Sequence, residues 1–224
     1  MERSKPYEEK NKLSLVISYL TLRKAIGILG ISFPVILVTG SLIIGEYDEI
    51  QSSISSYYHT NMRDVFVGIL CGIALFLFSY RGYNLIDNIA GDLGCLFALG
   101  VAFFPAAPDY SLLNDNALIG ELHLVSAALF FIVLIYFSLF LFTKSVEGRT
   151  LSKQKKYRNR VYRICGFTMF GCIFLIALYL LLLENCYPDL KNYDPVFWLE
   201  SIAIFAFGIS WLTKGQIILK DINE

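Results

Sequence analysis

The side chains best suited to chemistry in this chain are histidines and acids that stand beside or within long apolar segments. Four of them are candidates for catalysis: His59, Asp64, His123 and Glu200. Ionisable groups are costly inside a membrane, so those within apolar segments are functional candidates by default. Histidine and carboxylate together can act as general acid and base, or can hold a metal ion and its bound water. Whether the protein is an enzyme stays open; an enzymatic version would be a membrane hydrolase that acts on lipid.

Five further polar residues could hold a ligand. They are Ser55, Tyr58, Arg63, Asp92 and Glu121. The Arg63 guanidinium would suit a phosphate or carboxylate head group. His59 and Arg63 are four residues apart, so they share a face of any helix that includes both. A structural alternative is that Arg63 pairs with Asp64 or Glu121, while hydrogen bonds satisfy the histidines.

A metal site in this chain would draw on His59, His123 and Asp64, a set that could bind zinc. The chain has two histidines in all and lacks the H-E-x-x-H motif. A haem held by both histidines is conceivable, although only the pair itself supports it. The cofactor therefore stays open, with zinc as one candidate.

Six apolar segments must position these residues. They cover residues 25–44, 62–80, 85–104, 122–143, 164–183 and 195–213. A helix needs about 20 residues to cross about 30 Å of hydrocarbon, and backbone polar groups in lipid must be satisfied within the helix. The chain is 56% hydrophobic and 17% charged, whereas an ordinary soluble domain is about 25% charged. These features predict an all-α fold, a polytopic bundle of six transmembrane helices that forms a single domain over residues 1–224.

The distribution of Lys and Arg predicts how these helices are oriented. If both termini are cytoplasmic, 17 of the 19 basic residues fall on that side, and only Arg63 and Lys191 fall outside. An excess of Lys and Arg is typical of cytoplasmic loops, so we predict an N-in/C-in topology. This topology places most of the candidate site residues in one layer near the outer surface: His59, Arg63, Asp64, Glu121, His123 and Glu200.

Two segments outside the apolar blocks have distinctive sequence patterns. Residues 7–22 carry apolar side chains every three or four positions among polar neighbours, which is typical of an interfacial helix on the inner leaflet. Residues 144–163 form a basic cytoplasmic loop that contains the string SKQKKYRNRVYR. This loop could bind anionic lipid, or it could act only as a determinant of topology.

Asp92 lies within the third apolar segment and has no obvious partner there. It could line a proton or ion pathway, or it could be a buried acid that a neighbouring helix hydrogen-bonds. Asp87 and Asn88 are nearer the inner face, and with Arg81 and Lys214 they could form a set of structural ion pairs.

Glycines in the second apolar segment predict close helix packing. Gly68 and Gly72 form a G-x-x-x-G pair, and this spacing lets two helices approach closely. The contact could lie inside the bundle or between protomers of a homo-oligomer.

Four strings of the chain together resemble an uncharacterised family of bacterial six-span membrane proteins, which is related at a distance to DRAM-type membrane proteins. They are SISSYYHTNMRDVFVG, YRGY at residues 80–83, HLVSAALFF from His123 and ESIAIFAFGISWLTKG from Glu200. The resemblance covers most of the chain. It implies a location in the bacterial inner membrane and carries no activity with it.

A looser similarity is to the ceramidase-like membrane hydrolases, which combine Ser, Asp and three His around zinc. Ser55, His59, His123 and either Asp64 or Asp92 could play such parts here. The chain departs from that pattern because it has two histidines and lacks a paired H-x-x-x-H in its last apolar segment.

The leading hypothesis from the sequence is an outward-facing polar pocket that binds, and could process, a lipid or small amphiphile. A channel or transporter with Asp92 and Glu200 along its path is an alternative, as is a non-catalytic sensor or assembly factor that signals through the basic loop. Membrane lipid is the expected partner, and a homo-oligomer is possible. The net charge of zero gives no reason to expect a nucleic acid.

Overall fold

The computed structural model describes most of the chain in five stretches: residues 5–44, 49–82, 84–107, 117–145 and 152–219. Within these stretches the regular structure is helical, with no strand. This confirms the prediction of an all-α fold.

Six long helices make up the body of the molecule. They are α1 (Lys5–Ile44), α2 (Arg63–Phe78), α3 (Leu85–Phe103), α4 (Ala117–Tyr136), α5 (Lys153–Leu178) and α7 (Pro195–Lys214). Two π-helical segments extend them: η2 (Phe137–Leu141) follows α4, and η3 (Tyr179–Leu183) follows α5. Shorter helices lie in the connections: η1 (Ser55–His59), α6 (Glu184–Cys186) and η4 (Pro188–Tyr193).

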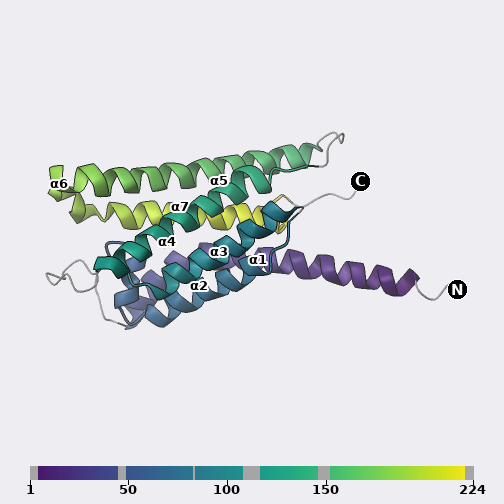
Figure 1. The fold of residues 1–224 in the computed structure, drawn as a ribbon, viewed down its shortest axis with the longest axis horizontal. Helices are drawn as coiled ribbons and strands as arrows, with labels where there is room; N and C mark the ends of the chain where they lie inside the picture. The colour runs from purple at the N-terminus through teal and green to yellow at the C-terminus, as the bar shows by residue number, and fades with distance from the viewer. Residues whose placement is uncertain (1–4, 45–48, 83, 108–116, 146–151, 220–224) are drawn as a thin grey trace.

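The six long helices form a closed ring in which each packs against two neighbours. The order around the ring is α1, α2, α3, α4, α5 and α7, and α7 packs against α1. Figure 1 shows the helices running along the long axis of the molecule, with the start of α1 extending beyond the others. We call the end that holds η1 and η4 the loop end, and the opposite end, where α3 and α5 begin and α7 ends, the basic end.

Five of the helical segments are long and apolar enough to cross a membrane. They are Tyr19–Ile44, Leu85–Phe103, Leu118–Leu141, Lys153–Leu183 and Pro195–Lys214. The remaining long helix, α2, has 16 residues and is about 24 Å long at 1.5 Å per residue. Large apolar side chains such as Ile43, Leu96 and Phe170 are exposed on the outside of the ring, as expected for helices that face lipid.

Two predicted segments outside the apolar blocks are continuous with long helices. Residues 7–22 form the first part of α1, which continues without a break into the apolar stretch. Residues 153–163 of the predicted basic loop are the first turns of α5, while residues 146–151 lie outside the described residues.

Glycines bring α1 and α7 into close contact. A Cβ added to Gly208 would lie 2.9 Å from the Gly27 carbonyl oxygen, and one on Gly30 would lie 3.2 Å from the Gly208 Cα atom. The G-x-x-x-G pair of α2 does not pack in this way: a Cβ on Gly68 would meet open space, and one on Gly72 would make a single ordinary contact. Between α2 and α3 the close approach is made by Gly91 of α3 instead, where an added Cβ would lie 2.8 Å from the Leu77 carbonyl oxygen.

An aromatic cluster closes the interior of the ring at the basic end. Its members are at most 2% exposed: Tyr80, Phe137, Phe142, Tyr162 and Trp211. Trp211 lies at the centre, with its ring centroid 5.0 Å from that of Phe142, 5.4 Å from that of Phe137 and 5.6 Å from that of Tyr80. Such tilted and edge-on pairs add stability beyond the area that they bury, so this cluster is a firm base for the helices around it.

Candidate functional site

The loop before α2 is fastened to the first turns of α7. The Ile54 N–H donates to Glu200 Oε2 at 2.7 Å, and the Phe197 N–H donates to the Ser52 carbonyl oxygen at 3.1 Å. The second bond satisfies one of the N–H groups that a helix leaves unpaired in its first turn. Glu200 also accepts a hydrogen bond from the backbone of Ser55. Its carboxylate thereby joins α7 to the start of η1.

Serine hydroxyls shape the same loop. Ser56 Oγ lies 2.8 Å from Ser53 Oγ and 3.1 Å from Ser52 Oγ, and the Ser56 N–H donates to Ser53 Oγ at 3.0 Å. Side chains of this kind often bond to nearby backbone in turns. They hold the loop in a compact form and leave hydroxyl groups facing the adjacent cavity.

The two histidines both bind the turn that follows α3. His59 Nε2 lies 2.8 Å from the Ala106 carbonyl oxygen, and His123 Nδ1 lies 2.6 Å from the Phe104 carbonyl oxygen. Because a carbonyl oxygen only accepts hydrogen bonds, each of these ring nitrogens carries the proton. His59 is exposed, whereas His123 is 4% exposed. The prediction that the two histidines lie in the same region therefore agrees with the geometry, although their surroundings differ.

A polar cavity of about 270 Å³ opens beside this turn. Its walls come from the loop before α2, the turn after α3, and from α4, α5, η3, α6, η4 and α7. The polar and charged groups that line it are Ser52, Ser53, Ser55, Ser56, His123, Tyr179, Glu184, Lys191, Asp194 and Glu200. Leu124 of α4, Ile176 of α5 and Leu180 of η3 also line this cavity, and apolar groups make up most of its wall.

A smaller apolar cavity of about 50 Å³ lies inside the ring. Five phenylalanines contribute to its lining: Phe33, Phe66, Phe130, Phe131 and Phe207. Ser55, Ala127 and Glu200 line both this cavity and the polar one. The two cavities therefore adjoin, with a polar chamber at the loop end and an apolar chamber toward the middle of the ring.

Arg63 contacts a tyrosine of the preceding loop. Its Nη2 atom donates to the Tyr58 hydroxyl at 2.7 Å, and its Cζ atom lies 4.5 Å from the centroid of the Tyr58 ring. In the described part of the chain Arg63 therefore binds a tyrosine. The sequence had suggested an ion pair with Asp64 or Glu121 as an alternative. Arg63, Asp64 and Glu121 are exposed, and among the described residues they are not part of the polar cavity wall.

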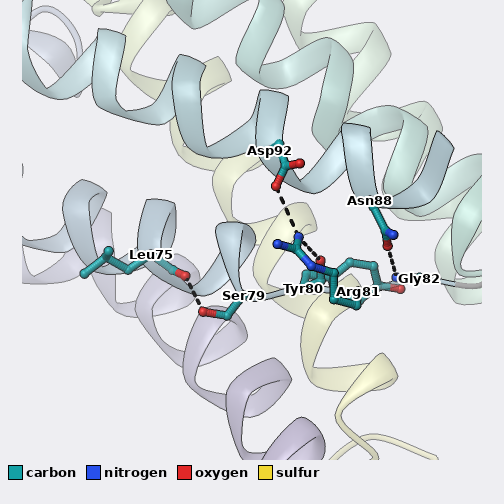
Figure 2. Close-up of polar contacts among 7 residues, drawn as sticks. All are labelled: Leu75, Ser79, Tyr80, Arg81, Gly82, Asn88 and Asp92. Carbon is teal, nitrogen blue, oxygen red and sulfur yellow. Dashed lines mark hydrogen bonds and ion pairs between the residues drawn. The ribbon is translucent and has the colours of Figure 1, made fainter. Parts of the chain in front are cut away.

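Asp92 belongs to the opposite end of the molecule. Its Oδ1 atom accepts from Arg81 Nη1 at 3.1 Å, and the same nitrogen donates to the Tyr80 carbonyl oxygen at 3.1 Å (Figure 2). Nearby, Asn88 Oδ1 accepts from the Gly82 N–H at 2.9 Å. The Asp92 side chain is 49% exposed and, within the described residues, contributes to neither cavity. These contacts tie the start of α3 to the link from α2.

The ion pairs at the basic end differ from the predicted set, which joined Asp87 and Asn88 with Arg81 and Lys214. Arg81 pairs with Asp92. Asp87 is fully buried, and its Oδ1 atom accepts a hydrogen bond from Lys144 Nζ. Lys144 follows η2 closely in the chain, so this contact joins the start of α3 to the end of the α4 span.

The predicted metal ligands are only partly brought together. His59 and His123 bind the same turn, while Asp64 is exposed in the first turn of α2. Among the residues that the structure describes, no group of three or more His, Cys, Asp or Glu side chains could hold a metal ion. A metal-ligating histidine often donates its second ring N–H to a backbone carbonyl, as both histidines do here, but the described residues supply no third ligand beside them.

Several residues of the polar cavity were not predicted from the sequence. Lys191 and Asp194 belong to η4 and its end, and Tyr179 begins the π-helical segment η3. The sequence could have pointed to Lys191, because it is one of only two basic residues that the predicted topology places on the outer side. Asp194 adopts a left-handed backbone conformation with φ 45° directly before Pro195, a geometry that Asp tolerates better than most residues. Single π-helical turns are frequent at functional sites.

Comparison with models of known protein families, with curated proteins and with solved structures found no match. The class of protein is therefore defined by the fold and composition of the chain itself. Five helices are long and apolar enough to cross a bilayer, and their outer faces carry exposed apolar side chains. These properties identify a helical, multi-pass membrane protein.

Proposed function

We propose that this protein binds a lipid or small amphiphile, with its polar head in the polar cavity and its apolar part directed into the ring. The observation that carries this proposal is that Ser55, Ala127 and Glu200 line both cavities. An amphiphile needs hydrogen-bonding groups at one end and apolar walls at the other, and ligand sites generally combine apolar walls with a few placed polar groups. The adjoining chambers supply both.

The apolar part of the polar cavity wall offers a route from the bilayer. Leu124, Ile176 and Leu180 lie on α4, α5 and η3, which are neighbours in the ring and membrane-facing helices. In Figure 1, α4 meets α5 toward the basic end and diverges from it toward the loop end. A ligand with an acyl chain would enter between these helices without leaving the hydrocarbon.

The charges of the polar cavity favour a head group rich in hydroxyl or amine groups. Three acids, Glu184, Asp194 and Glu200, line it together with one lysine, Lys191. Carboxylates accept hydrogen bonds, so these acids suit donor groups on the ligand. Arg63, which could hold an anionic head group, is not part of the described wall of this cavity. A neutral or cationic head therefore fits the cavity better than an anionic one.

Any hydrolysis of the bound ligand would use His123 and Glu200. Of the four predicted catalytic residues, these two line the polar cavity, and a general acid or base must reach the proton that it transfers. His59 and Asp64 stand outside the described wall of this cavity. Their removal should affect binding less than the removal of His123 or Glu200.

The same proposal includes six spans with both termini cytoplasmic, in a bacterial inner membrane. Although α2 has 16 residues, it packs in the ring between α1 and α3, and Met62 and Ser79 extend its length by a residue at each end. The start of α1 and the end of α7 lie toward the same end of the molecule (Figure 1), as an even number of spans requires. The basic residues supply the orientation.

The test is to fill the junction of the two cavities. Ala127→Phe places a ring where both chambers meet, while Ala128→Phe adds the same ring on the exposed side of α4. The measurement is the affinity of purified protein in detergent for a fluorescent single-chain amphiphile with a hydroxyl-rich head. Ala127→Phe should weaken binding about tenfold or more, corresponding to about 1.4 kcal/mol, and Ala128→Phe should leave it nearly unchanged. Equal affinity of both variants and the parent protein would refute the proposal.

A further inference from the structure

A groove on the outer side of α5 is lined by cations and, further along the helix, by apolar side chains. It is open and has a volume of about 700 Å³, within the range of about 300–1,000 Å³ that is typical of small-molecule sites. Its basic residues are Lys156, Arg160 and Arg163, its large apolar residues are Ile164 and Phe167, and Asn159 and Thr168 complete the lining. We call it the basic groove.

The charged and apolar parts of the basic groove follow one face of the helix. Positions 156, 160, 163 and 167 are three or four residues apart, and residues with this spacing lie on the same side of an α-helix. The three cations are exposed, and Ile164 and Phe167 are 60% and 64% exposed. The face is therefore polar near the start of α5 and apolar on the turns that follow.

The basic groove lies at the edge of a predicted span. The apolar segment predicted from the sequence begins at residue 164, directly after the last cation of the groove. The helix packs against α4 and α7 and runs along one edge of the molecule (Figure 1). Of the five helical segments able to cross a membrane, Lys153–Leu183 is the least buried, with 28% of its most apolar stretch buried. The groove is therefore on a surface that lipid can reach.

The charge of the basic groove is not neutralised within the described part of the chain. Among the described residues, the ion pairs at this end are those of Asp87 and Asp92, and neither pair includes a cation of the groove. The lining of the groove, as far as the structure describes it, contains no acid. Three formal positive charges therefore face the surroundings of α5.

We propose that the basic groove binds an anionic phospholipid of the surrounding leaflet, with its phosphate at the cations and an acyl chain along Ile164 and Phe167. Arg presents a planar fork of donors to phosphate, and Lys presents a point charge. Basic residues beside a transmembrane helix attract anionic lipid, by about fivefold in affinity for each residue near the surface. A phospholipid uses both halves of the groove, whereas a soluble phosphate compound would use the cations alone.

A second copy of the chain fits this face less well than a lipid does. A two-fold interface places the same surface patch of both subunits against itself. An interface centred on the basic groove would bring the three cations of one copy close to those of the other, and like charges opposed across an interface are unfavourable. An anionic phospholipid instead supplies the charge that the groove lacks.

The experiment reads lipid contact at the apolar end of the basic groove. Phe167→Trp places a fluorophore there, and Leu75→Trp places one on α2 as the control, because Leu75 is also 64% exposed. Each variant is reconstituted in phosphatidylcholine bilayers that contain brominated phosphatidylglycerol or brominated phosphatidylcholine. Bromine on the acyl chain quenches a nearby indole, so the quenching gives the relative affinity of the two lipids at each position. The quenching of Trp198 and Trp211 in the parent protein is subtracted.

The basic groove should give a preference for phosphatidylglycerol of about fivefold or more at position 167 and little preference at position 75. Adding Arg160→Gln and Arg163→Gln to Phe167→Trp should remove most of this preference. Equal preference at the two positions would reveal a general attraction to the charged end of the molecule and would overturn the proposal, as would no preference at either position. Quenching by both lipids at position 75 with none at position 167 would mean that another copy covers the groove, and it too would overturn the proposal.

A control for net charge adds Lys10→Gln and Lys12→Gln to Phe167→Trp. These changes remove the same two charges from the first part of α1, which extends beyond the ring at the same end of the molecule (Figure 1). The preference at position 167 should persist in this variant. If it fell as far as with the two arginine changes, the net charge of the protein and not the basic groove would attract the lipid, and the proposal would be wrong.

Discussion

The two ends of the ring both collect ionisable side chains, but they satisfy them differently. At the loop end, Glu200 is held by backbone N–H groups and His123 by a backbone carbonyl, around a cavity. At the basic end, Arg23 and Lys214 lie over aromatic rings, and the acids Asp87 and Asp92 pair with Lys144 and Arg81. Backbone partners are fixed by the fold and leave a prearranged site, whereas a side-chain ion pair depends on both partners keeping their charge.

The largest effect is expected at the basic end, from the loss of its buried acid. Asp87→Asn removes the charge that Lys144 binds in a fully buried position, and breaking one half of a buried ion pair costs about 3–5 kcal/mol. We expect the free energy of unfolding to fall by about 3 kcal/mol, because Lys144 is partly exposed. Chemical unfolding in detergent measures this loss.

The matched control for this prediction is Asp92→Asn. Asp92 and Arg81 are each about half exposed, so their pair should contribute at most about 1 kcal/mol. If the two variants lose the same free energy of unfolding, the burial of Asp87 does not explain its contribution to stability.

An intermediate effect is expected at the loop end from Glu200→Ala. This change leaves the N–H groups of Ile54 and Ser55 without their acceptor, and an unsatisfied buried group costs about 1–3 kcal/mol. We expect the protein to lose about 2 kcal/mol and the Ile54 amide to exchange faster with deuterium, because the loop is released from α7.

Glu200→Gln separates the hydrogen bond from the charge. The amide oxygen keeps an acceptor in place, so this variant should lose less than half as much stability as Glu200→Ala. A loss as large as that of the alanine variant would mean that the loop end depends on the charge of Glu200, as the basic end depends on the charge of Asp87.

The smallest effect is expected from Arg63→Ala. Arg63 is exposed and binds Tyr58 outside the described wall of the polar cavity, and exposed substitutions usually change stability by about 0.5 kcal/mol or less. Binding of the fluorescent amphiphile should stay within about twofold of the parent protein. If Arg63→Ala weakened binding about as much as Ala127→Phe, Arg63 would belong to the ligand site.

The helical segments were largely predictable because a membrane span appears in the sequence as a long apolar block with clear ends. The predicted segment 85–104 corresponds to α3 (Leu85–Phe103), and 195–213 corresponds to α7 (Pro195–Lys214). Asn84 caps the start of α3 through its side chain, and a proline begins α7, as helix starts often do. The segment 62–80 became the shorter helix α2, so its role as a sixth span stays a prediction.

The candidate site was predictable only in part. His123 and Glu200 line the polar cavity, while Arg63 and Asp64 are exposed outside its described wall. A helix that is apolar on all sides has no periodic pattern to show which face turns inward. The rotation of α2 about its own axis, and with it the direction of Gly68, followed from packing against its neighbours.

The sequence by itself determined that the chain is helical, rich in membrane-spanning segments and sorted by charge, because these properties follow from the local run of apolar and basic residues. Only the tertiary structure decided that the helices close into a ring, that Glu200 lines both a polar and an apolar chamber, and that an aromatic cluster around Trp211 closes the basic end. These arrangements join residues far apart in the chain, and the rotation and neighbours of each helix are set by packing, which no local pattern records.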